Sequence, residues 1–301
     1  MFSLRRLGEP EAAQDLVGFH FDDSKTAIVD GRYDRLQYIS SVTHSAIYRA
    51  RDLQRGQAVI LDGPSFYTQE GWEESMRAFD TETEVRRRLG SHPHIEETIE
   101  IARKRQHPYI VTETLDGLDL SKIGIDIRAL VEYRPETFVI ITRIALLLLD
   151  TLAYIHAKGV ILGPEGLSER CILLRGKDSS LFAGIQRRFF DNDLDGLPLK
   201  FKIIWSARPC DSSNDPRFTQ DLQALTEAIA SNLYSYHFSV PLVTAHFPKY
   251  FIEVLKRGAG RYTDQPHFNS VAELRAALSP FAELAPWIES FQLAAEQPWL
   301  L

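Results

Sequence analysis

The chain has 301 residues, of which 44% are hydrophobic and 25% are charged, and its formal net charge at pH 7 is −7. This composition is ordinary for a folded globular protein and argues against an intrinsically disordered chain. The acidic balance gives no electrostatic footprint for nucleic acid, so no nucleic-acid partner is expected.

Short strands with alternating apolar residues fill the first third of the chain, after a polar leader over residues 1–30. Gly90 ends the only helical pattern in this part, and the turn signal Ser91-His92-Pro93-His94 follows it. The pattern predicts one helix over 70–89 and strands over 26–29, 33–39, 46–51, 57–61, 97–102 and 108–113.

From about residue 115 the apolar period becomes helical, and helices are predicted over 135–158, 219–233, 248–257 and 271–278. Strands followed by helices indicate an α+β protein with two lobes. We divide the chain into the leader 1–30, a small β-rich lobe 31–114, a helical lobe 115–280 and an apolar C-terminal tail 281–301.

That tail contains Trp287, Phe291 and Trp299, which is unusually apolar for a free chain end. We expect it to dock either on the chain's own helical lobe or on a partner.

The most apolar run, Thr137 to Leu152, contains Arg143 and Asp150 and is shorter than the ~18 uninterrupted apolar residues of a membrane span. It is therefore predicted to be a buried helix, and the N-terminus lacks the apolar core of a signal peptide. Cys171 and Cys210 stand in no metal-binding or disulfide-scaffold pattern. A cytoplasmic protein without membrane association is expected.

Glu82 stands seven residues before the run Leu89-Gly90-Ser91-His92-Pro93-His94-Ile95, and further segments follow over 109–120, 152–161, 221–225 and 270–278. In this order, these segments resemble the bacterial Ser/Thr protein kinase family over about residues 33–278. In that resemblance, Glu82 is the αC glutamate before its turn, 109–120 is the fifth strand and hinge with Thr112 as gatekeeper, and the last three segments are similar to later family helices. The resemblance implies a protein kinase-like two-lobed fold, with a small β-rich N-lobe carrying one αC helix and a larger helical C-lobe.

Phosphoryl transfer on this fold requires a glycine-rich turn, a strand lysine held by the αC glutamate, a catalytic-loop aspartate with an asparagine, and a metal-binding aspartate. No lysine occurs between Lys25 and Lys104. The resemblance places Asp62 at the lysine, Pro164 at the catalytic aspartate, Cys171 at the asparagine, Phe182 at the metal-binding aspartate, and Ser40, Val42 and Ser45 at the three glycines. Glu82 is retained.

These replacements remove the groups that hold Mg-ATP. An aspartate repels the phosphate that a lysine attracts, and a phenyl ring offers no oxygen to magnesium. We therefore predict no catalytic residue, no cofactor and no metal. The resemblance also implies a vestigial nucleotide pocket of Ile47, Ile60, Thr112 and Leu173, closed if the three apolar side chains meet.

Two acidic residues keep predicted roles. Glu82 has lost the lysine, so we expect it to pair with Arg49, Arg51 or Arg86. Asp221 is expected to bond backbone amides of the rebuilt catalytic loop. Glu165 could act as a displaced base, but an insertion of about two residues leaves it without a defined position.

The leading functional prediction is a pseudokinase that acts as a scaffold or regulatory module for a protein partner, such as a signalling protein or an active kinase. Candidate contact surfaces are the tail, the helix over 70–89 and the activation segment over 185–208. One alternative is a non-catalytic nucleotide sensor, because Thr112 and the hinge backbone suit an adenine edge. A noncanonical nucleotidyl or phosphoryl transferase is the other, and it needs a basic phosphate cradle that the sequence does not offer.

Overall fold

The computed structural model describes residues 28–42, 45–64, 69–103, 108–115, 117–120, 122, 135–175, 199–204, 206–212, 215–234, 247–261 and 266–295. The described residues form two compact units divided after Leu115, with Pro93–Ile95 belonging to the second unit. Phe182, Trp299, most of the predicted leader and residues 185–198 of the predicted activation segment lie outside the described residues.

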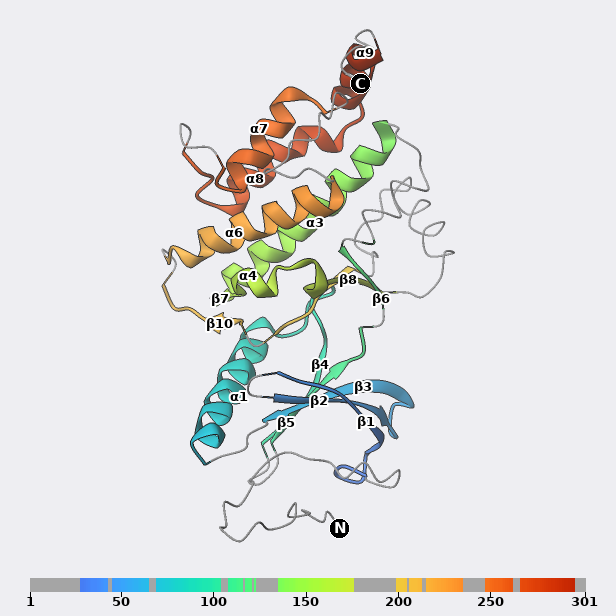
Figure 1. The fold of residues 1–301 in the computed structure, drawn as a ribbon, viewed down its shortest axis with the longest axis vertical. Helices are drawn as coiled ribbons and strands as arrows, with labels where there is room; N and C mark the ends of the chain where they lie inside the picture. The colour runs from blue at the N-terminus through green and yellow to red at the C-terminus, as the bar shows by residue number, and fades with distance from the viewer. Residues whose placement is uncertain are drawn as a thin grey trace. The chain divides into compact units, whose positions relative to one another are not determined.

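The first unit is a five-stranded antiparallel sheet with one helix (Figure 1). Its strand order is β1-β2-β3-β5-β4, and helix α1 follows β3 in the chain. The elements are β1 (Tyr33–Val42), β2 (Ser45–Asp52), β3 (Gln57–Pro64), α1 (Gln69–Leu89), β4 (Thr98–Ala102) and β5 (Tyr109–Glu113). These bounds confirm the predicted strands and helix after residue 33 to within a few residues.

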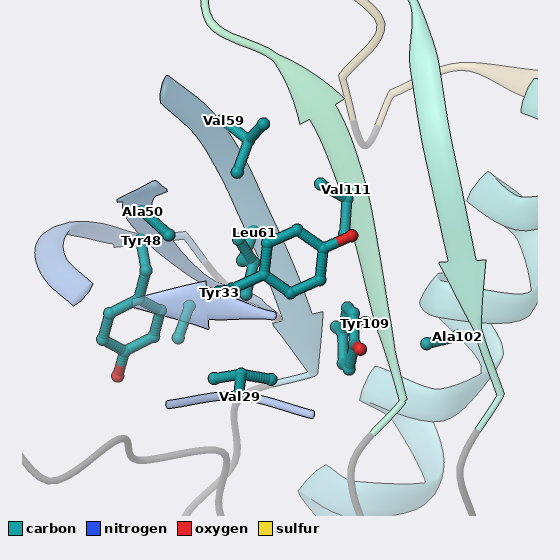
Figure 2. Packing of buried hydrophobic residues seen from close by; sticks show 10 residues of the cluster. Val29, Tyr33, Tyr48, Ala50, Val59, Leu61, Ala102, Tyr109 and Val111 are labelled. Atoms are coloured by element: carbon teal, nitrogen blue, oxygen red, sulfur yellow. The ribbon is translucent and has the colours of Figure 1, made fainter. Parts of the chain in front are cut away.

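One face of this sheet forms an apolar core. Alternate residues of each strand point to the same face, and Tyr48, Leu61 and Val111 are all buried there. Figure 2 shows these side chains gathered with Tyr33 and Tyr109, whose rings meet edge to face with centroids 6.1 Å apart. The opposite face of the sheet carries Asp62 and Thr112.

An arginine fastens the segment before β1 to this sheet. The Arg32 guanidinium donates from Nε and Nη2 to the two carboxylate oxygens of buried Asp52, at 3.0 and 2.6 Å, and from Nη1 to Glu100 on β4 at 2.8 Å. Val29, three residues earlier, lies in the apolar core. Because the pair is bidentate and one partner is buried, it holds this segment more firmly than an exposed ion pair would.

The second unit is mainly helical. Its long helices are α3 (Pro135–Ala157), α6 (Arg217–Ala228), α7 (Lys249–Gly258), α8 (Val271–Leu278) and α9 (Ala285–Ala295), and α6 continues as a π-helical turn over Ile229–Leu233. Its short elements are β6 (Gly117–Asp119), β7 (Val160–Ile161), α4 (Gly163–Gly166), a 3₁₀ turn (Glu169–Cys171), β8 (Ile172–Arg175), β9 (Leu199–Phe201), β10 (Arg208–Pro209) and a second 3₁₀ turn (Ser279–Ala282). The four predicted helices of this part are confirmed.

Helix α3 is the central helix of the second unit. Phe138–Ala157 is long and apolar enough to cross a membrane by length and composition, but 72% of its apolar window is buried inside the protein. Helices α8 and α9 pack against it. This burial is typical of the core helix of a soluble domain, as the sequence predicts.

The described part of the predicted tail belongs to this core. Trp287 of α9 is fully buried, its ring stacks on Phe138 of α3 at a centroid distance of 4.9 Å, and its Nε1 donates to the Phe281 carbonyl oxygen at 2.7 Å. Phe251 of α7 meets the same indole at 5.0 Å. Of the two docking sites expected for the tail, residues 281–295 use the chain's own helical unit.

Candidate functional site

The predicted site residues of the first unit share one face of the sheet. Ile47 stands directly opposite Asp62 in the β2–β3 register, and Ile60 stands opposite Thr112 in the β3–β5 register. Direct partners in an antiparallel pair point to the same face, as do residues two apart on one strand. The fold therefore brings Ile47, Ile60, Asp62 and Thr112 together on the face away from the aromatic core.

The predicted glycine-loop positions lie on the paired strands β1 and β2, beyond a register shift between Tyr38 and Ser40. Ser40 on β1 pairs with Ile47 on β2, and Val42 pairs with Ser45. Ordinary strand pairing at all three positions is consistent with the loss of glycine, because none of them carries a positive φ angle.

Helix α1 contributes the charged groups. Phe79, Glu82, Arg86 and Leu89 recur at three- and four-residue spacing, which places them along one side of the helix. Phe79, Arg86 and Leu89 are buried, and the Glu82 side chain is only 14% exposed. The side of α1 that packs inward therefore carries an ion pair between the buried apolar residues Phe79 and Leu89.

Arg86 forms a buried network with these neighbours. Its Nε donates to Glu82 Oε1 at 2.8 Å, and its Nη1 donates to Glu96 Oε2 at 3.1 Å and to Thr98 Oγ1 at 3.3 Å. The Thr112 hydroxyl donates to the other oxygen of Glu96 at 3.3 Å. The prediction that Glu82 pairs with an arginine is confirmed, and Arg86 is that arginine. We call Asp62, Glu82, Arg86 and Glu96 the Arg86 cluster.

The sequence reasoning missed Glu96 and Thr98. Both follow the turn after α1, and the sequence around a polar residue at the start of a strand does not indicate which side chain it will contact. The gatekeeper position is also engaged, because Thr112 is buried and bonded to Glu96.

Asp62 on β3 is a second acidic residue near Glu82 of α1. Burial and the negative charge of Glu82 raise the pKa of Asp62 to about 7, against the opposing effects of a hydrogen bond from Ser45 and the positive charge of Arg86. The strand position that should attract phosphate thus carries a carboxyl group beside two further acidic residues. When its carboxyl groups are ionised, such a surface repels a phosphate group.

The second unit holds the residues aligned with the catalytic loop. Asp221 on α6 is fully buried and accepts hydrogen bonds from the amides of Leu162 and Gly163, at 2.8 and 2.9 Å. His156 Nε2 lies 3.2 Å from the same carboxylate. This confirms the predicted role of Asp221. Gly163 has φ +75°, a conformation that favours glycine, so the chain turns sharply there into α4.

Pro164 and Cys171 occupy two short helical turns. Pro164 lies in the first turn of α4 and is exposed, as is Glu165, whereas Cys171 is buried and its thiol donates to the Glu165 carbonyl oxygen at 3.4 Å. A proline has no proton to exchange, and a thiol engaged with the backbone offers no hard oxygen to magnesium. Within the described residues, no group of three or more His, Cys, Asp or Glu side chains is arranged to hold a metal ion.

Leu173 lies on β8 in the second unit, opposite Asp119 and Lys200. Ile47 and Ile60 belong to the first unit, so the predicted closure of the pocket by these three side chains stays a prediction. Phe182, at the predicted metal-binding position, lies outside the described residues.

Replacing Asp221 with asparagine should lower the free energy of unfolding of the second unit by about 1–3 kcal/mol, because an amide has one acceptor oxygen for two buried N–H groups. Urea unfolding measures this change. Asp150→Asn is the matched control, since Asp150 pairs with Arg275 at the surface and its loss should change stability by less than about 1 kcal/mol. Equal effects of the two variants would contradict the structural role of Asp221.

Comparison with known proteins identifies the fold. No protein-family model matches the sequence, and no curated protein matches it. Among solved structures, the Mycobacterium tuberculosis PknI kinase domain superimposes with a TM-score of 0.52 at 16% identity, covering 85% of this chain and 98% of that one. A single-residue mutant of the same domain gives 0.53 at 17% identity, covering 86% and 100%. The chain therefore has a bacterial-type protein kinase-like α+β fold, which confirms the predicted fold class.

Proposed function

We propose that this chain is a pseudokinase, a protein kinase-like domain without phosphoryl transfer that acts as a cytoplasmic scaffold or regulatory module for a protein partner. The observation that carries the proposal is the Arg86 cluster. Glu82, at the position of the αC glutamate, is engaged by Arg86 of its own helix, while Asp62 stands at the lysine position. Catalysis on this fold is almost all positioning and charge stabilisation, so this reversal of charge removes a central part of it.

The second unit supports the same proposal. Asp221 still shapes the loop, but the loop presents Pro164 and an inward-facing Cys171 where the reaction needs an acid–base group and a metal ligand. The scaffold of the fold is kept while its chemical groups are replaced. A protein that retains the shape alone is suited to binding another macromolecule.

The proposed contact surface is the exposed side of α1. In the described part of the tail, Trp287 is part of the core and does not contribute to a contact surface. Along α1 the exposed side chains Glu73, Arg77 and Arg87 form a mixed-charge face, on which Arg87 pairs with Glu84 at 2.7 Å. Such a face suits a protein partner of alternating charge, such as a signalling protein or an active kinase.

Incubation with radiolabelled Mg-ATP and a generic protein substrate tests the lack of catalysis. We expect no transfer of label and no rise in melting temperature. For comparison, a site filled at roughly 100 times its Kd would add about 2.7 kcal/mol, or several degrees in a domain of this size. Asp62→Lys is the matched variant, and it should also give no transfer, because Pro164 is unchanged.

The two alternative functions give different results in the same experiment. A melting-temperature rise without label transfer would replace the proposal by nucleotide sensing. Label transfer by the natural protein would overturn the proposal outright, and its loss in Glu165→Gln would assign the base to Glu165.

A further inference from the structure

The Arg86 cluster has more acidic than basic groups. Arg86 is buried, with a side chain 4% exposed, and Glu96 is buried beside it at 3%. Glu82 is paired with Arg86, and the strand register places Asp62 on the same sheet face as Thr112, whose hydroxyl bonds Glu96. If all three carboxyl groups were ionised, three negative charges would face one positive charge, leaving an excess of two in a poorly solvated space. Such an excess is unfavourable because solvent screens buried charges weakly.

The hydrogen bonds show where a proton relieves this excess. Glu82 and Glu96 both accept charge-assisted hydrogen bonds from Arg86. Asp62 is bonded instead by the neutral hydroxyl of Ser45. Asp62 is therefore the member of the cluster with the least support for a negative charge.

The charged groups around Asp62 come from each element packed on this face of the first unit. Helix α1 supplies Glu82 and Arg86, and the segment before β4 supplies Glu96. Strand β2 carries Arg49 on the same face, two residues beyond Ile47. Glu82 is the largest electrostatic influence on Asp62 and belongs to a different element, so their repulsion acts between α1 and β3.

We propose that Asp62 is a proton-operated latch that holds helix α1 against strand β3 when it is protonated and loosens that contact when it ionises. With the proton bound, Asp62 presents a neutral carboxyl group to Glu82. When the proton leaves, two carboxylates face each other, and the repulsion is relieved by movement of α1 away from the strand.

The direction of the pH effect follows from the raised pKa of Asp62, about 7 in the folded protein. The folded state binds this proton more tightly than the unfolded state, whose aspartate has an ordinary pKa. Stability of the first unit is therefore lost as pH rises from the ordinary aspartate range toward about 7, and changes little above it. The latch operates at the upper end of that window, around neutral pH.

Hydrogen exchange of residues 69–89 between pH 5.5 and 8 tests the latch. The measured quantity is the protection factor, which is corrected for the intrinsic pH dependence of exchange, with α3 of the second unit as internal reference. In the natural protein we expect protection of α1 to fall roughly tenfold or more across this range. In Asp62→Asn, which is neutral at every pH, protection should stay nearly constant.

Glu84→Gln is the matched control on the same helix. Hydrogen bonds from Arg88 and Arg87 at the surface hold the pKa of Glu84 below its usual range, so it does not titrate in this window. This variant should keep the pH profile of the natural protein. A flat profile in the natural protein, or the same fall in Asp62→Asn, would overturn the proposal.

A direct titration covers the case in which Asp62→Asn does not fold. In the natural protein, the carbon-13 resonance of the Asp62 carboxyl group should shift with a midpoint near neutral pH. A midpoint in the ordinary aspartate range, around 4, would also overturn the latch. The kinase-like fold and the lack of catalysis do not depend on this result.

Discussion

Replacing Arg86 with methionine should lower the free energy of unfolding of the first unit by about 3–5 kcal/mol, one of the largest effects we expect for any single substitution in this chain. The guanidinium is buried and bonds Glu82, Glu96 and Thr98 at once. Methionine fills much of the same space but leaves the carboxylates without a counter-charge. Urea unfolding followed by circular dichroism measures the loss.

Two further variants separate this charge effect from a packing effect. Arg87→Met removes the neighbouring arginine, whose side chain is 72% exposed, and should change stability by less than about 1 kcal/mol. Arg86→Met combined with Glu82→Gln and Glu96→Gln removes the stranded charges and should recover much of the lost stability. If the triple variant is no more stable than Arg86→Met alone, the charges are not the cause.

Replacing Trp287 with alanine should destabilise the second unit by about 3–5 kcal/mol. The indole is fully buried, stacks on Phe138, meets Phe251 and bonds the Phe281 carbonyl oxygen through Nε1. Alanine would leave a cavity among aromatic rings and an unpaired carbonyl oxygen. Thermal and urea unfolding should both show the change.

Ile288→Ala is the control for this prediction, because Ile288 is the next residue of α9 and is 40% exposed. Its loss should change stability by less than about 1 kcal/mol, as is usual for surface positions. A similarly small effect of Trp287→Ala would mean that α9 is not part of the core. The same reasoning predicts that removing all residues after Leu278 weakens the second unit, whatever partner the protein has.

The strands and long helices were predictable from the sequence because their signals are local. The alternation around Tyr48 and Leu61, and the helical period leading to Gly90, reflect which side of each element is buried. For the segment of α9, the sequence predicts only an apolar tail. Trp287 and Phe291 stand one helical turn apart, and their packing depends on Phe138, about 150 residues earlier in the chain.

The candidate site was predictable in part. The Glu82–Arg86 pair has four-residue spacing within one helix, which singles it out from Arg49 and Arg51 on β2. The contact of Glu96 with Arg86 depends on the path of the chain after α1, and no local sequence pattern predicts that path. Likewise, the insertion before Cys171 was visible, but its folding into α4 and a 3₁₀ turn depends on Asp221, from a distant helix.

The Glu82–Arg86 pair lies wholly within one helix. An ion pair that joins a helix to a strand depends on the distance between them, because it breaks when the two elements separate. The Glu82–Arg86 pair lies inside α1 and moves with the helix, so it does not depend on the distance between the helix and the strand. The bonds from Arg86 to Glu96 and Thr98, which lie outside α1, do depend on that distance. A lysine introduced at position 62 would therefore meet a Glu82 that is already paired with Arg86, and this one substitution would not create a lysine–glutamate pair.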